Sequence, residues 1–230
     1  SGYLESSFGE GYLTVENEEA FCIDINADFR NGYKKRQDLH NRLSKEQISK
    51  IALSLEYFNQ NGSGNEGLNR EQIYLMKQCI VWRNLSKFLG WNCGGVRPEF
   101  ALLSSEVQNS IFKNAEDFAD KNANRYECGG YLYSGDGQDL GQFWAKLNVG
   151  YGKIKKTSSN TLISEGNSLY ELSHAKYGVY DSNLLTNKIG ELMTDTNGES
   201  EVLELPVGKF FIKEIEAPKG FLKDETIYLM

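Results

Sequence analysis

The side chain best suited to covalent chemistry in this chain is a cysteine near its start. Cys22 stands between two large apolar residues, Phe21 and Ile23, and is followed by Asp24. The thiolate, not the thiol, is the nucleophile, and a free thiol titrates near about 8.5.

Two interpretations of Cys22 are open on the residues alone. A cysteine between large apolar side chains is usually a packing residue, because a free thiol behaves as a small hydrophobe. As the nucleophile of a hydrolase or acyltransferase, Cys22 would need a general base. The two histidines are His40, after a polar segment, and His174, far along the chain.

Composition excludes several classes of function. The chain has 230 residues, 40% of them hydrophobic, which suits one large or two ordinary domains. Its net charge of −7 gives no reason to expect nucleic acid or an anionic membrane as a partner. No apolar run approaches about 18 residues, so no membrane insertion is expected. Phosphate-binding and zinc-binding motifs are absent, and no cofactor or metal is predicted.

The remaining cysteines number too few for a disulfide framework. Cys79 falls in an apolar helical segment and is expected to be core. Cys93 and Cys128 each neighbour a pair of glycines, and they are candidates for a disulfide in an oxidising exterior. Connectivity cannot be deduced from the sequence, so this pairing stays open.

The first part of the chain is expected to place strands on either side of a group of helices. Three capping patterns precede apolar stripes at helical spacing, at Ser44 with Gln47, Asn69 with Gln72, and Ser105 with Gln108. The polar segment 32–42 is predicted to be a loop. The predicted strands, which alternate β-branched or aromatic residues with polar ones, are 12–25 with a turn at 17–19, 125–133 and 138–144.

Three pieces in this order resemble the thioester domains of Gram-positive surface adhesins: Phe21-Cys22-Ile23-Asp24, Lys77-Gln78-Cys79-Ile80-Val81-Trp82 and Gly137-Gln138-Asp139-Leu140. The match departs from the family pattern at Lys77, where threonine is usual, and at Asp139, where an apolar residue is common.

The resemblance implies a thioester between Cys22 and Gln138, which follows it by 116 residues (138 − 22), with Gln142 as the alternative acyl residue. In that reaction a cysteine thiolate attacks a held glutamine carboxamide, expels ammonia and leaves a thioester, which is a far better acyl donor than the amide. Holding the two groups together can supply about 7–11 kcal/mol of the barrier. The alternatives are a cysteine hydrolase or acyltransferase with Cys22 as nucleophile, and a structural, pilin-like subunit in which Cys22 is a core residue. Gln78 is expected to be a buried amide that hydrogen-bonds to backbone.

The same resemblance implies a partner and a location. The thioester would acylate one amine and be consumed, so the chain would bind covalently without turnover and would not be an enzyme. The expected partner is a host surface or matrix protein that carries a reactive lysine amine. The expected location is extracellular, on a bacterial cell surface, with cell-wall attachment through a segment outside this sequence.

The pattern changes at Gly150, where helical stripes give way to short strands and turns. Asp195-Thr196-Asn197-Gly198 is a strong hairpin signal. Seven short strands are predicted, which is typical of a small all-β sandwich: 153–156, 168–172, 176–180, 190–194, 202–205, 209–216 and 226–229.

Three segments of this second part resemble the collagen-adhesin B-type (CnaB-like) repeat domain: Ala175-Lys176-Tyr177-Gly178-Val179-Tyr180, Leu205-Pro206-Val207-Gly208-Lys209-Phe210 and Glu214-Ile215-Glu216-Ala217-Pro218-Lys219-Gly220-Phe221. The resemblance implies an inverse-immunoglobulin-like fold. It also implies an isopeptide bond from an early lysine to a late Asn or Asp, assisted by a buried glutamate. By position these are Lys153 and Glu214, with Lys155 and Lys156 as competing lysines. The acceptor is expected to be missing, which leaves a Lys153–Glu214 ion pair or hydrogen bond.

The predicted fold class is therefore α+β. A β-rich thioester domain with a helical insertion is expected over 1–149. An all-β, inverse-immunoglobulin-like sandwich is expected over 150–230, without the end of its final strand.

Overall fold

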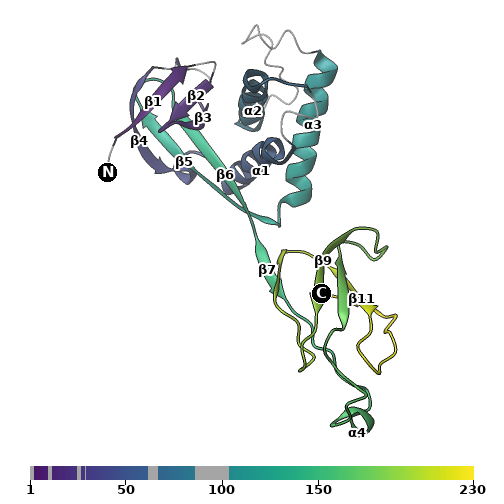
Figure 1. Cartoon of the computed structure of the whole chain (residues 1–230). Coiled ribbons are helices and arrows are strands. Elements are labelled where there is room, and N and C mark those ends of the chain that lie inside the picture. Colours follow the sequence, from purple (N-terminus) through teal and green to yellow (C-terminus); the bar gives the residue numbers. More distant parts are fainter. Residues whose placement is uncertain (1–2, 10–11, 25–26, 29, 62–66, 86–103) are drawn as a thin grey trace. The chain divides into compact units, whose positions relative to one another are not determined.

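The computed structural model describes residues 3–9, 12–24, 27–28, 30–61, 67–85 and 104–230, with side chains from residue 12 onward. The chain divides into two compact units, Ser1–Lys146 and Leu147–Met230. Each unit has its own hydrophobic core and is described separately (Figure 1).

The first unit is built on a closed antiparallel barrel with the strand order β1-β2-β3-β6-β5-β4. β3 meets β6 through two register pairs, Phe21 with Gly141 and Cys22 with Leu140, whereas β4 meets β5 through five. The junction between β3 and β6 is therefore short. The strands are β1 (Tyr3–Gly9), β2 (Tyr12–Val15), β3 (Glu18–Cys22), β4 (Gly32–Asp38), β5 (Tyr126–Gly135) and β6 (Leu140–Leu147).

The prediction of a loop at 32–42 is wrong, because Gly32–Asp38 is the strand β4 and Leu39–Asn41 is a short 3-10 helix, η1. β4 pairs with both β1 and β5, so its backbone is satisfied although its side chains are polar. Lys34 is the buried residue of this strand, and its neighbours Tyr33 and Lys35 are exposed. A lysine at the inward position removed the alternation that normally identifies a strand.

Three helices follow β4 in the chain and lie together beside the barrel (Figure 1). The capping boxes at Ser44–Gln47 and Asn69–Gln72 are confirmed, each by two reciprocal hydrogen bonds of 2.8–3.1 Å. The third helix is capped by Ser104, one residue earlier than predicted. α1 packs against β5, and α2 packs against β3. The helices are α1 (Lys45–Asn61), α2 (Arg70–Leu85) and α3 (Ser105–Asn122).

The second unit contains a two-stranded sheet, β10-β7, and a four-stranded sheet, β12-β11-β8-β9. Its core is apolar and includes Ala175, Val179 and Ile212. Segment 168–172 is not a strand, and the early lysine segment contributes a single bridge, Lys155 with Glu199. The elements are β7 (Val149–Gly152), α4 (Thr161–Ser164), β8 (Lys176–Tyr180), β9 (Lys188–Met193), β10 (Leu203–Pro206), β11 (Phe211–Glu216) and β12 (Ile227–Leu229).

Within the described ranges, no helix is both long enough and apolar enough to cross a membrane.

Candidate functional site

Cys22 and Gln138 lie at the same end of the short β3–β6 junction. Cys22 is the last residue of β3 and pairs with Leu140, and the Ile23 amide donates to the Asp139 carbonyl at 3.1 Å. In an antiparallel ladder, the residues two positions from a direct partner are diagonal neighbours on the same face. Gln138 and Gln142 are both at that distance from Leu140. Cys22 is 4% exposed and Gln138 is 7% exposed, so thiol and carboxamide are both withdrawn from water.

The side chain of Gln142 is committed elsewhere. Its Oε1 accepts from the Tyr133 hydroxyl at 2.6 Å, and its Nε2 donates to the carbonyls of Val15 and Glu18 at 3.3 Å. The amide thereby bridges β5 to the turn between β2 and β3. Among the described residues, Gln138 is not held in this way by its side chain. Strand alternation could not separate the two glutamines, and in the structure their side chains differ in their hydrogen bonds.

Gln78 projects from α2 onto the backbone of Cys22. The Cys22 amide donates to Gln78 Oε1 at 2.8 Å, and Gln78 Nε2 donates to the Cys22 carbonyl at 2.9 Å. The prediction of a buried amide bonded to backbone is confirmed, since Gln78 is buried and makes both bonds. The sequence did not indicate that the backbone in question is that of Cys22.

The Cys22 thiol is in a setting that favours its neutral form. Burial raises the pKa of Cys22, and hydrogen bonds with the Asp24 backbone and the Trp82 side chain oppose this effect. The charges of Asp24 and Asp139 raise the pKa further. Sγ donates to the Asp24 carbonyl at 3.1 Å. This thiol differs from the exposed, low-pKa thiolate of a redox sensor or cysteine protease.

The histidines do not supply the base that an enzyme nucleophile would need. His40 Nδ1 lies 2.9 Å from Asp38 Oδ1 at an exposed position, and the His174 ring contacts Ser173 in the second unit. Within the described residues of the first unit, His40 is not a hydrogen-bond partner of Cys22.

Lys34 is the residue of this site that sequence reasoning missed. It is 1% exposed, and its Nζ donates to the carbonyls of Asp136 and Gln138, both at 2.8 Å. Burial lowers the pKa of Lys34, while the charges of Asp139, Asp136 and Cys22 act in the opposite direction. The sequence signal that could have identified Lys34 was a lysine at an inward-facing position of the short strand β4. This strand lies within the segment 32–42 that is predicted to be a loop.

The turn before β6 fixes the backbone of Gln138. Gly137 has a φ of +78°, a left-handed conformation that glycine adopts without strain. A Cβ at this position would lie 2.7 Å from the Asp28 carbonyl. The same carbonyl accepts from the Gln138 amide at 3.1 Å, so a residue larger than glycine would displace this contact.

The cysteines other than Cys22 differ in their bonding from what the sequence predicts. Cys79 is buried in the core of the helices, as predicted, but it is disulfide-bonded rather than a free thiol. Cys128 is free, so the suggested Cys93–Cys128 bond is wrong. Cys93 itself lies outside the described residues. Among those residues, no group of three His, Cys, Asp or Glu side chains could hold a metal ion.

In the second unit, Lys153 and Glu214 are not brought together. Lys153 is exposed and pairs with Glu199 at 3.0 Å, whereas Lys156 Nζ lies 2.9 Å from Glu214 Oε1. The Lys156 side chain is 11% exposed and that of Glu214 is 0% exposed. The expected ion pair therefore exists, but it involves the competing lysine. Lys153 and Lys156 are an odd number of residues apart, so an extended segment turns them to opposite sides.

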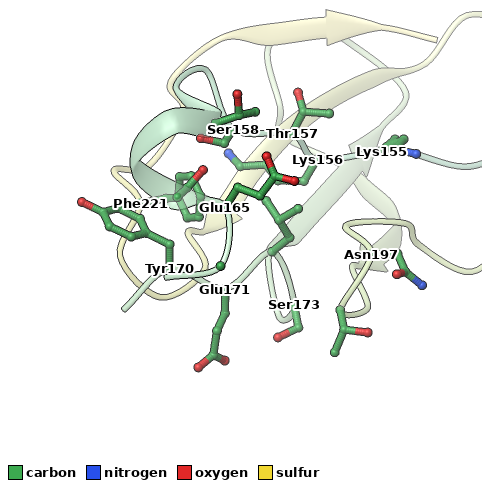
Figure 2. Close-up of a pocket in the computed structure, with 15 residues that line it drawn as sticks. Lys155, Lys156, Thr157, Ser158, Glu165, Tyr170, Glu171, Ser173, Asn197 and Phe221 are labelled. Carbon is green, nitrogen blue, oxygen red and sulfur yellow. The ribbon is translucent and has the colours of Figure 1, made fainter. Parts of the chain in front are cut away.

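Glu214 has two further neighbours. Its Oε2 accepts from the Asp224 backbone amide at 2.5 Å. Burial raises the pKa of Tyr177, and the nearby charge of Glu214 raises it further. Lys156 also lines a cavity of about 550 Å³ in the second unit, together with Thr157, Ser158 and the ring pair Tyr170–Phe221 (Figure 2).

Asp224 is the one Asp or Asn after Phe221 in this sequence, and its carboxylate is engaged elsewhere. It accepts from the Tyr228 hydroxyl at 2.6 Å and from the Thr226 amide at 2.9 Å. These bonds, led by that of Tyr228, lower the pKa of Asp224 to about 2. Asp224 therefore meets Glu214 through its backbone and not through its carboxylate.

This lowered pKa predicts an acid-dependent stability. An aspartate with an unfolded pKa of about 3.9 contributes its stabilisation fully above that value, and the contribution is lost as the pH falls through the folded value of about 2. We expect the melting temperature of the second unit to fall less between about pH 5 and pH 2 in Asp224→Asn than in the wild type. Thermal unfolding at both pH values measures the difference. Equal falls in the two proteins would contradict the assignment.

Comparison with known proteins gives one match by sequence family. Residues 150–230 match the family model described as SpaA, a prealbumin-like fold domain. No curated protein matches the chain.

Two solved structures show remote likenesses. The Bacillus anthracis TIE protein has 12% identity and a TM-score of 0.41 over 100% of this chain. The N-terminal domain of the Streptococcus pyogenes pilus tip adhesin Cpa has 15% identity and a TM-score of 0.40, with 63% of this chain and 92% of that chain covered. The chain spans 63% of the TIE protein's length. Both scores are too low to establish a shared fold. The second unit is thus similar, over residues 150–230, to the SpaA prealbumin-like fold domain.

Proposed function

We propose that this chain is part of a surface adhesin of a Gram-positive bacterium, and that its first unit binds an amine covalently through an internal thioester between Cys22 and Gln138. The single observation that carries the proposal is the placement of a buried thiol and a buried carboxamide at one end of the β3–β6 junction. The prealbumin-like match of the second unit supports the adhesin context. In this setting the second unit is a stalk segment.

The chemistry balances without a cofactor. Cys22 Sγ attacks Cδ of Gln138, the C–S bond forms as the C–N bond breaks, and the thiol proton leaves with the amide nitrogen as ammonia. A primary amine, such as a lysine side chain on a host surface or matrix protein, then attacks the same carbon. The product is an amide on residue 138 and a free Cys22 thiol. Burial of the site keeps water from competing for the acyl group before the amine arrives.

The hydrogen bonds of the other nearby glutamines favour Gln138 as the acyl residue. Gln142 is held by Tyr133 and by the turn between β2 and β3, and Gln78 is held by the Cys22 backbone. Moving either amide to the thiol would break at least two buried or partly buried hydrogen bonds, each worth about 1 kcal/mol net.

Intact mass tests the proposal. Freshly prepared protein should be lighter than its sequence mass by one ammonia. The sample is first treated with a phosphine, which reduces the Cys79 disulfide and so removes its effect on the mass. Cys22→Ala and Gln138→Ala should both show the full mass of their sequences, and Gln142→Ala should still lose ammonia. Incubation of the wild type with methylamine should label residue 138 and free one thiol.

Each alternative gives a different result. If Cys22 is an enzyme nucleophile or a core residue, the wild type should have its full mass, and Cys22 should be alkylated after unfolding. Either finding would reject the thioester. A methylamine label on residue 142 or 78 would keep the thioester and reject Gln138.

A further inference from the structure

Lys34 is buried without a carboxylate partner, which is unusual for a lysine. Its side chain is 1% exposed, and no ion pair of Lys34 is recorded among the described residues. Buried lysines are rare unless they are paired, because removing an ammonium from water costs several kcal/mol. The partners of Lys34 Nζ are instead two backbone carbonyls, those of Asp136 and Gln138. Because burying the Lys34 ammonium costs free energy, the groups that it contacts should indicate its function.

Both carbonyls belong to the turn that carries Gln138. The bonds join β4 to residues 102 and 104 positions later, on the far side of the helices in the chain. Gly135, the register partner of Lys34, permits the close approach. A Cβ at Gly135 would lie 2.9 Å from the Tyr33 carbonyl and 3.7 Å from Lys34 Cγ. Lys34 therefore fixes the backbone of Gln138 from inside the barrel.

Lys34 is also a buried positive charge at the turn that carries Gln138, which meets Cys22 at the β3–β6 junction. The charges of Asp139, of Asp136 and, to a smaller extent, of a Cys22 thiolate favour the ammonium form of Lys34. The pKa of Cys22 itself is raised by burial and lowered by the hydrogen bonds with Asp24 and Trp82. The charged groups facing Cys22 are otherwise Asp24 and Asp139, and both disfavour a thiolate.

We propose that Lys34 is the positioning residue of the Cys22–Gln138 pair. Its two hydrogen bonds hold the turn so that the Gln138 carboxamide faces Cys22, and its buried charge stabilises the thiolate that attacks. Lys34 ends the reaction with the protons it began with, because the thiol proton departs with ammonia. This role of Lys34 rests on the proposed thioester. The first test does not depend on the thioester, because it measures the effect of Lys34 on the Cys22 thiol where no thioester can form.

The first measurement is the thiolate titration of Cys22 in a Gln138→Ala background, where no thioester can form. Absorbance of the thiolate is followed against pH, and the Cys22→Ala protein is subtracted to remove the other cysteines. Adding Lys34→Gln should raise the pKa of Cys22, because a neutral amide keeps an N–H donor for the carbonyls but removes the charge. Lys34→Arg keeps the positive charge, so the pKa of Cys22 should stay close to its value in the protein with Lys34. Lys35→Met, exposed on the same strand, is the matched control and should leave the titration unchanged.

The second measurement is the rate at which refolded protein loses ammonia, followed by mass. At neutral pH, Lys34→Gln should slow it by about tenfold for each unit by which the titration finds the pKa of Cys22 raised, because the thiolate fraction falls by that factor. Its pH profile should move to higher pH by the shift found in the titration. Lys34→Met, which lacks both hydrogen bonds and charge, should be slower still or fail to fold, and in the latter case Lys34→Gln decides.

The outcomes separate the two proposals. An unchanged Cys22 titration in Lys34→Gln, or a rate equal to that of wild type, overturns the role of Lys34. Full-mass wild-type protein with a shifted titration rejects the thioester and retains Lys34 as the charge that governs the thiol.

Discussion

Replacing Lys156 with methionine should lower the free energy of unfolding of the second unit by about 3–5 kcal/mol. Glu214 is fully buried, and Lys156 is the cation recorded against its carboxylate, at 2.9 Å. Methionine has a similar length but no charge, so the variant leaves a buried carboxylate uncompensated. Hydrogen exchange of the β8 and β11 amides is the suitable measurement, since the second unit contains no tryptophan.

The matched control is Lys153→Met. Its pair with Glu199 is exposed, and a surface ion pair contributes about 0–1 kcal/mol. The double variant Lys156→Met/Glu214→Gln should recover most of the loss, because the introduced amide is neutral and its oxygen can still accept from the Asp224 amide. Similar losses for Lys156→Met and Lys153→Met would show that the buried pair is not what stabilises this unit.

A mass measurement on Cys22→Ala accompanies this prediction. We expect the full sequence mass, because the Asp224 carboxylate is occupied by Tyr228 and Thr226. A residual loss of ammonia or water that Lys156→Met abolishes would reveal a cross-link from this lysine.

Replacing Gln78 with methionine should destabilise the first unit by about 2–6 kcal/mol. The change removes both hydrogen bonds to the Cys22 backbone and leaves a buried amide and a buried carbonyl unpaired, at about 1–3 kcal/mol for each group. Denaturant unfolding followed by tryptophan fluorescence reports on this unit, which contains all three tryptophans.

The contact is with backbone, so the loss should be the same in a Cys22→Ala background. Gln60→Met is a matched control, because the Gln60 amide makes its hydrogen bonds at the surface. A loss that disappears in Cys22→Ala would mean that Gln78 acts on the thiol side chain instead.

Local signals in the sequence predicted the elements that local interactions define. The capping boxes at Ser44 and Asn69 place two helix starts correctly, because each box is complete within four residues. The strand β4 was missed since its pairing with β1 and β5 is non-local, and its one buried side chain is a lysine. A buried lysine is stabilised by carbonyls more than one hundred residues away, which no local window contains.

Alternation along a strand limited the prediction of the reactive side chains in two ways. Gln138 and Gln142 share a face, so the sequence could name both but could not choose between them. Lys153, Lys155 and Lys156 were all candidates, and a difference of one residue in register decides which lysine turns inward. That register depends on the sheet that the segment packs against, and Lys156 is the residue that reaches Glu214.

The short junction between β3 and β6 has a mechanical consequence. Two register pairs join β3 to β6 at Cys22, in the described part of the chain, and the contact between β4 and β5 has five. A thioester at this position would be a covalent bond across this short strand junction. Acyl transfer to an amine would move that bond from the barrel to the ligand. The protein would then become covalently attached to its ligand and, in the same step, lose the cross-link between β3 and β6 of its own barrel.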